Sequence, residues 1–139
     1  MRKRTIYITE YDLERLSELL LNSAGGDDYG GRDDLKKLEV ALDRGKVLTP
    51  KDIPKDVITM NSKVILIELE SGKEITCTLV FPNEADIDHY KISILAPIGT
   101  AMLGYHVGDT FAWKVPAGVK RFKVKEILYQ PEAAGDYHL

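Results

Sequence analysis

The spacing of apolar residues changes near residue 50, and this change limits the chain to a fold with a helical part and a sheet part. Up to residue 45, leucines recur at intervals of three and four, which places them on one face of a helix. Two groups share this spacing: Leu13, Leu16 and Leu20, and then Leu35, Leu38 and Leu42. From residue 58 the apolar residues alternate with polar ones, which is typical of strands.

The ends of the two predicted helices carry recognisable signals. Thr9 precedes the first helix and Asp12 follows three residues later, close to a capping box. The glycine-rich stretch "SAGGDDYGG" cannot continue a helix, and Asp33 or Asp34 can cap a second one. Gly45 is expected at the C′ position of that second helix. The pattern predicts a short antiparallel helical hairpin (coiled coil) with arms of about 20 Å.

The second half predicts a small antiparallel sheet. Turn signals at Ser71-Gly72 and at Pro116–Gly118 each join two strands, and residues 90–97 form a further strand between these hairpins. The stretch "PIGTAMLG" is long enough for a short helix, with Pro97 at its favoured first position. Alternation selects inward-facing residues on the first two strands: Val64, Leu66, Ile75, Cys77 and Leu79. It also puts four residues of the last strand on one face: Phe122, Val124, Glu126 and Leu128.

The stretch between the two halves, "TPKDIPKDV" at residues 49–57, contains two prolines and alternating charges. This composition disfavours both a helix and a central strand. We therefore expect an α+β protein with a helical hairpin over residues 1–50 and a sheet domain over residues 51–139. A length of 139 residues with 44% hydrophobic side chains is enough for one real core.

The overall composition excludes several classes of protein. The net charge of -3 gives no general attraction to nucleic acid or to anionic membranes. The single cysteine, Cys77, excludes a disulfide framework and is expected to be a small buried apolar residue. The N-terminus lacks the apolar stretch of a signal peptide, and no apolar segment approaches the length of a membrane helix. We expect a cytoplasmic protein.

The residues with catalytic or metal-binding chemistry do not form a recognisable motif. His89, His106 and His138 lie in separate segments without ligand-like spacing, and glycine-rich phosphate loops are absent. Several lysines give the last hairpin a basic character, which a solvated strand face or a defended sheet edge explains better than nucleic-acid contact. We therefore expect no catalytic residue, no metal and no cofactor.

Four acidic residues gather at the tip of the predicted hairpin: Asp27, Asp28, Asp33 and Asp34. In one interpretation these acids belong to a solvated loop and cap the second helix. In the other, paired carboxylates at a protruding tip bind a Mg²⁺ ion whose remaining ligands are water molecules.

The passage "ILAPIGTAMLGYHVGDTFAW", residues 94–113, is almost without charge. It interrupts the sheet with a proline turn that carries Leu95, Pro97, Ile98 and Met102. A stiff turn with small neighbours loses little entropy on docking, and apolar groups can enter the hydrophobic centre of an interface. This passage is therefore expected to dock onto another protein, with Leu95 and Pro97 as exposed anchors.

The same residues resemble the C-terminal domain of the bacterial transcript-cleavage factors GreA and GreB. The shared pattern is a strand, then Ala96–Gly104 as the proline turn, then Gly108-Asp109, then Val115–Gly118, and a closing strand that ends in tyrosine. Within that family the chain is most similar to the branch of regulators of nucleoside diphosphate kinase (Rnk). The marks of this branch are "DVITMNSKV", "APIGTAMLG", the short N-terminal hairpin and the ending "YQPEAAGDYHL".

The resemblance implies an FKBP-like C-terminal domain that binds RNA polymerase at the rim of its secondary channel. The positions carried over for this contact are Leu95, Ala96, Pro97 and Ile98. The cleavage factors have an acidic residue where this chain has Leu95, and serine where it has Ala96, so the surface here is more apolar. Any effect on nucleoside diphosphate kinase levels is expected to be indirect.

Cleavage factors use a much longer coiled coil with acids at its tip. An arm of about 20 Å is too short to reach a deeply buried centre, so we expect a non-enzymatic regulator that competes with Gre factors. It would come near DNA and RNA only through the polymerase, with no membrane and no small-molecule substrate. Two alternatives remain: transcript cleavage through Asp27 and Asp28, and peptidyl-prolyl isomerisation, suggested only by the FKBP-like fold.

Overall fold

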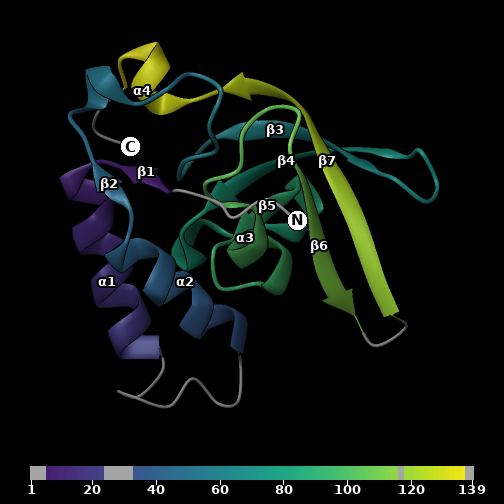
Figure 1. Ribbon diagram of the computed structural model, residues 1–139, viewed down its shortest axis with the longest axis horizontal. Coiled ribbons are helices and arrows are strands. Elements are labelled where there is room, and N and C mark those ends of the chain that lie inside the picture. The colour runs from purple at the N-terminus through teal and green to yellow at the C-terminus, as the bar shows by residue number, and fades with distance from the viewer. Residues whose placement is uncertain (1–5, 24–32, 116–117, 137–139) are drawn as a thin grey trace.

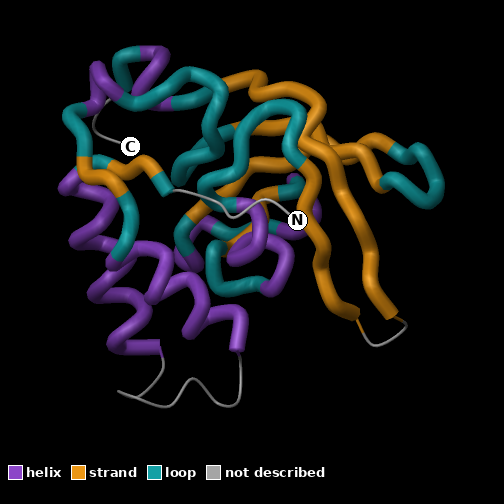
Figure 2. The backbone as a smooth tube through the Cα atoms, viewed as in Figure 1, coloured by secondary structure: helices purple, strands orange, loops and turns teal. Residues whose placement is uncertain are grey.

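The computed structural model describes residues 6–23, 33–115 and 118–136. Two helices lie side by side next to a five-stranded sheet, and a short helix sits between them (Figure 1). The helices are α1 (Glu10–Ser23), α2 (Asp33–Asp43), α3 (Pro97–Met102) and α4 (Pro131–Ala134). The sheet strands are β3 (Lys63–Glu68), β4 (Glu74–Val80), β5 (Lys91–Ser93), β6 (Thr110–Val115) and β7 (Gly118–Tyr129). The expected mixed α+β architecture is confirmed (Figure 2).

The first helix begins where the sequence predicts. The backbone N–H of Asp12 donates to Oγ1 of Thr9 at 3.2 Å, so Thr9 caps α1. The Asp12 carboxylate does not complete the capping box, because it pairs with the guanidinium of Arg15 instead. The second helix begins at Asp33, so Asp33 and Asp34 lie in its first turn rather than before it.

The N-terminal half also contains a short parallel ribbon that the sequence pattern did not indicate. β1 (Tyr7–Ile8) pairs with β2 (Lys46–Val47). Gly45 lies beside this ribbon, two residues after the end of α2, and it is not among the glycines with positive φ, so it does not form a left-handed helix cap. A Cβ on Gly45 would instead lie 2.8 Å from the carbonyl oxygen of Ile6, so glycine is needed there for close backbone approach.

The sheet has the order β5-β4-β3-β7-β6. Neighbouring strands are antiparallel except at one edge, where β4 and β5 are parallel. The expectation of a wholly antiparallel sheet is wrong at this edge. The connection from β4 to β5 passes through two 3₁₀ turns, η2 (Pro82–Glu84) and η3 (Ile87–His89), and this crossover reverses the direction of β5 relative to a hairpin.

The last strand changes its inward face along its length. Its register with β3 shifts between Lys63 and Val64 and again between Ile65 and Leu66. Phe122 and Val124 are buried as predicted, but Leu128 is 46% exposed. The single-face prediction is therefore wrong beyond Val124, since each bulge moves the following residues to the other face.

One continuous hydrophobic cluster joins the two halves of the chain. It contains the helix leucines Leu16, Leu20, Leu38 and Leu42 together with the sheet residues Phe111 and Phe122. The rings of Phe111 and Phe122 are stacked with centroids 5.8 Å apart. The leucine faces of α1 and α2 are thus buried against the sheet half, which stabilises helices too short to persist alone.

The C-terminal segment folds back onto the connection between the halves. After β7, the side-chain Nε2 of Gln130 donates to the carbonyls of Pro54 and Val57 at 2.8 Å and 2.7 Å. Oγ1 of Thr59 donates to the Glu132 carboxylate at 2.8 Å. Gln130 and Glu132 are both buried, so α4 holds the 54–59 segment in place. Tyr137 and Leu139 lie outside the described residues.

Candidate functional site

The proline turn leads from β5 into α3. Ala96 has an extended backbone conformation (φ -70°, ψ 145°) and Pro97 takes the first helical position, as expected. The N–H of Ala96 donates to the carbonyl of Ser93 at 3.0 Å, and the N–H of Leu95 donates to Ser93 Oγ at 3.0 Å. The buried hydroxyl of Thr100 donates to the carbonyl of Ile94. These bonds hold both ends of the turn.

A close backbone contact further restricts the turn. A Cβ on Gly99 would lie 2.1 Å from the carbonyl oxygen of Ser93, which no side chain could tolerate without a backbone shift. At the end of α3, Gly104 has a φ of 90°, and a Cβ there would lie 2.8 Å from Cγ1 of Ile6. The turn is therefore fixed on one side against β5 and on the other against the N-terminal half.

The side chains of this passage divide into an inner and an outer set. Ile94, Met102 and Leu103 are fully buried in the core. Leu95, Ala96 and Ile98 are half-buried, and Leu95 and Ile98 also pack against the core cluster. Leu95 is therefore less exposed than the sequence analysis expected. The structure describes the backbone of Pro97, and its side chain lies outside the description.

The acidic tip is only partly described. Asp27 and Asp28 lie outside the described residues, and Asp33 and Asp34 are described by backbone alone, at the start of α2. The predicted grouping of Asp27 and Asp28 with Asp33 and Asp34 therefore stays a prediction.

The first helix contacts the sheet half through Arg15, which also forms an ion pair with the buried Asp12 within α1. Asp12 is 2% exposed and pairs with Arg15, whose guanidinium lies 3.9 Å from the ring centroid of Tyr11 and 4.4 Å from that of Phe81. Burial raises the pKa of Asp12 from 3.8 to about 6, with a smaller contribution from the Glu132 carboxylate, while Arg15 acts in the opposite direction. The Arg15–Phe81 contact joins α1 to the residue that directly follows β4.

The basic residues of the last hairpin are largely paired. The Nε of Arg121 lies 2.9 Å from the Glu70 carboxylate, and the Nζ of Lys125 lies 2.6 Å from that of Glu74. β7 lies between β3 and β6, and Lys123 pairs with a residue of each neighbouring strand, so Lys123 does not defend a sheet edge. The acidic partners reduce the positive potential of this face, which makes it a poor nucleic-acid surface.

Groups that could support catalysis or metal binding are dispersed. Within residues 6–23, 33–115 and 118–136 there is no group of three or more potential metal ligands. Cys77 is buried, and desolvation raises the pKa of its thiol to about 12, so it is a structural residue rather than a nucleophile. The part of the chain that the structure describes contains no helix with the length and apolar character needed to cross a membrane.

Sequence reasoning missed the buried polar residues that organise the molecule. Asp12 was read only as a cap, and Gln130 and Glu132 were not singled out. Gln130 and Glu132 flank Pro131, directly after the last strand, in a place where most chains fray. One signal could have identified these two residues. The last strand is followed at once by polar residues and by a short stretch that can form a helix, which indicates an ordered C-terminal segment.

Comparison with known proteins agrees with this architecture. The family model described as "Transcription elongation factor, GreA/GreB, C-term" matches residues 53–129, and the model described as "Rnk N-terminus" matches residues 4–48. The "Regulator of nucleoside diphosphate kinase" of Escherichia coli (strain K12) is 41% identical over 140 residues, covering 100% of both chains.

Two further relatives carry the name of transcription elongation factors. "Transcription elongation factor GreA" of Syntrophotalea carbinolica is 35% identical over 95 residues, covering 68% of this chain and 60% of that protein. The solved structure "Prokaryotic transcription elongation factor GreA/GreB from Nitrosomonas europaea" is 39% identical with a TM-score of 0.76, covering 91% of this chain and 100% of that one. The chain therefore belongs to the GreA/GreB family of transcription elongation factors, in its branch of regulators of nucleoside diphosphate kinase.

Proposed function

We propose that this protein is a non-catalytic transcription regulator that binds RNA polymerase through the turn at Leu95, Ala96, Pro97 and Ile98. It docks at the rim of the secondary channel, through an FKBP-like domain over residues 51–139. It competes there with cleavage factors of its own family, because two proteins that claim one site exclude each other without any allosteric step. Family membership supports the partner, and the geometry of the turn supports the contact.

The observation that carries this proposal is the rigidity of the turn. Ser93 accepts the Ala96 N–H, Gly99 lies against the Ser93 carbonyl, and Thr100 is bonded to Ile94. A surface that is already ordered before binding loses little conformational entropy on association. The half-buried side chains of Leu95 and Ile98 retain apolar area that a partner can cover.

The helical hairpin supports occupancy of the channel entrance without cleavage. α1 has 14 residues and α2 has 11. The longer helix spans only about 21 Å. Because the leucines of both helices are buried in the same cluster as the sheet residues, the hairpin is seated on the domain over much of its length.

Binding to the RNA polymerase core enzyme tests the proposal. Pro97→Asp is expected to weaken binding at least tenfold, about 1.4 kcal/mol, because it places a charge in the apolar centre of the interface. Val119→Asp is the matched control, since Val119 is 54% exposed on β7, outside the turn. The Val119→Asp variant should bind RNA polymerase like the wild type. Excess GreA should displace the wild type and the Val119→Asp variant from RNA polymerase.

Three outcomes would contradict the proposal. They are equal affinities of the Pro97→Asp and Val119→Asp variants, binding that excess GreA does not reduce, and RNA shortening in stalled complexes that is lost on Asp27→Asn plus Asp28→Asn. The last outcome would make the chain a cleavage factor.

A further inference from the structure

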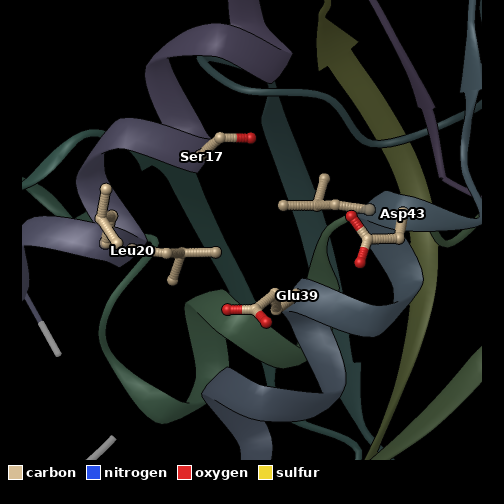
Figure 3. A pocket seen from close by; sticks show the side chains of 6 residues that line it. Ser17, Leu20, Glu39 and Asp43 are labelled. Carbon is tan, nitrogen blue, oxygen red and sulfur yellow. The ribbon is translucent and has the colours of Figure 1, made fainter. Parts of the chain in front are cut away.

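A groove lies between α1 and α2, on the helical half of the molecule, and none of the residues that line it belongs to the proline turn. Ser17, Leu20 and Leu21 line it from α1, and Glu39, Leu42 and Asp43 line it from α2. Figure 3 shows the Ser17 hydroxyl and the carboxylates of Glu39 and Asp43 directed into the space between the two helices.

The groove combines an apolar floor with an exposed apolar wall. Leu20 and Leu42 are 3% and 5% exposed and belong to the core cluster, whereas Leu21 is 63% exposed. The cavity volume is about 250 Å³. This is below the range of about 300–1,000 Å³ for small-molecule sites, but it suits one or two side chains of leucine size. The shape therefore fits an anchor residue of a protein segment better than a cofactor.

The charges at this groove are unbalanced. Glu39 and Asp43 are four residues apart on one face of α2, and none of the described residues that line the groove is cationic. Like charges at this spacing destabilise a helix. Asp43 is also the last residue of α2, whose last turn contains no basic residue, so its carboxylate faces the negative end of the helix dipole.

Within the described part of the chain, neither Glu39 nor Asp43 forms an ion pair or a side-chain hydrogen bond. The carboxylates of Glu39 and Asp43 repel each other beside an apolar groove, so the site is complementary to a ligand that carries positive charge. Such a ligand would remove the repulsion and cover Leu21 at the same time.

We propose that the α1–α2 groove docks a basic amphipathic segment of a partner protein, which inserts a leucine-sized side chain and places lysine or arginine beside Glu39 and Asp43. The site lies on the opposite half of the chain from the turn, and it stands whether or not the turn binds RNA polymerase. Helix-in-groove recognition of this kind uses apolar anchors for affinity and flanking charges for specificity.

The test uses the full chain labelled for NMR and two synthetic amphipathic helices of equal length. One helix contains leucine and lysine, and the other contains leucine and glutamate. The leucine–lysine peptide is expected to shift resonances within residues 17–21 and 39–43, and the leucine–glutamate peptide is expected not to bind. Glu39→Lys plus Asp43→Lys should lower affinity for the leucine–lysine peptide at least tenfold and allow the other peptide to bind.

A matched variant controls for net charge. Glu84→Lys plus Asp88→Lys changes the charge of the protein by the same amount at exposed positions of the β4–β5 connection. This control should bind the leucine–lysine peptide like the wild type. Both variants change exposed side chains and are expected to remain folded, which circular dichroism checks.

Three results would overturn the proposal. The first is that both lysine variants lose affinity equally, since binding would then reflect net charge alone. The second is that the peptide shifts resonances of the sheet rather than of the groove. The third is a wild-type dimer in sedimentation that Glu39→Lys plus Asp43→Lys dissociates, because the groove would then be filled by a second copy of this chain.

Discussion

Replacing Gly99 by alanine separates two effects that predict opposite changes in stability. Gly99 lies in the interior of α3 and is not among the residues with positive φ, so its backbone conformation suits alanine. Alanine is favoured over glycine in a helix by about 1 kcal/mol. Helix propensity alone therefore predicts that Gly99→Ala stabilises the protein.

The contact with β5 predicts the reverse. The new Cβ would lie 2.1 Å from the Ser93 carbonyl oxygen, 3.0 Å from the Ser93 carbonyl carbon and 3.3 Å from Cγ2 of Ile92. Overpacking of this kind destabilises by about 1–3 kcal/mol. The Ser93 carbonyl accepts the Ala96 N–H, so moving it also weakens a hydrogen bond that contributes about 1 kcal/mol. The net expectation is a loss of about 1–3 kcal/mol in the free energy of unfolding.

Urea unfolding, monitored by far-UV circular dichroism, measures this loss. The comparison requires that the slope of the unfolding free energy against urea concentration is the same in the variant and the wild type. The same variant should bind RNA polymerase at least tenfold more weakly under conditions where it is folded, because the turn is displaced. Gly72→Ala is the control. Gly72 has a φ of 73° with no atom within 4 Å of a new Cβ, so alanine there introduces backbone strain without a clash. It should lose stability without losing polymerase affinity.

A Gly99→Ala protein that is more stable than the wild type would refute the reasoning, because it would show that the Ser93 contact does not constrain the turn. If the variant is less stable but binds RNA polymerase as well as the wild type, the Gly99–Ser93 contact stabilises the fold but has no role in docking.

Two further predictions concern buried groups. Since the pKa of Asp12 is raised from 3.8 to about 6, its stabilising effect is complete below pH 3.8 and is lost as pH rises through about 6. Between about pH 4 and pH 7 the wild type should lose about 3 kcal/mol of unfolding free energy relative to Asp12→Asn, measured by urea unfolding, and a pH-independent difference would contradict this. The Cys77 thiol, whose pKa is raised to about 12, should react with a thiol reagent at pH 8 only as fast as the protein opens, and immediate labelling of the folded chain would contradict this.

Most secondary structure could be predicted from local patterns. The leucine spacing predicted the buried stripes of α1 and α2, and alternation predicted the strands around Ser71-Gly72. Pro97 correctly marked the first residue of α3. These features depend on residues close together in the chain, so a single sequence contains the necessary information.

The prediction of the site was less complete, because part of its geometry depends on residues that are far apart in the chain. The sequence singled out Leu95 and Pro97, and it predicted that the passage is a stiff turn. It did not indicate that Leu95 is half-buried, or that Gly99 lies against Ser93. Burial and close approach depend on what packs against a residue, which periodicity does not specify.

By itself, the sequence determined the two leucine-striped helices, the main strands and their order, the position of the turn and the family to which the chain belongs. The tertiary structure decided the parallel pairing of β4 with β5, the bulges of β7, the fastening of Gln130 to Pro54 and Val57, and the groove beside Glu39 and Asp43. The reason is physical: periodicity and capping act within one or two turns of chain. Register, burial and charge balance arise only when segments distant in the sequence share the same space.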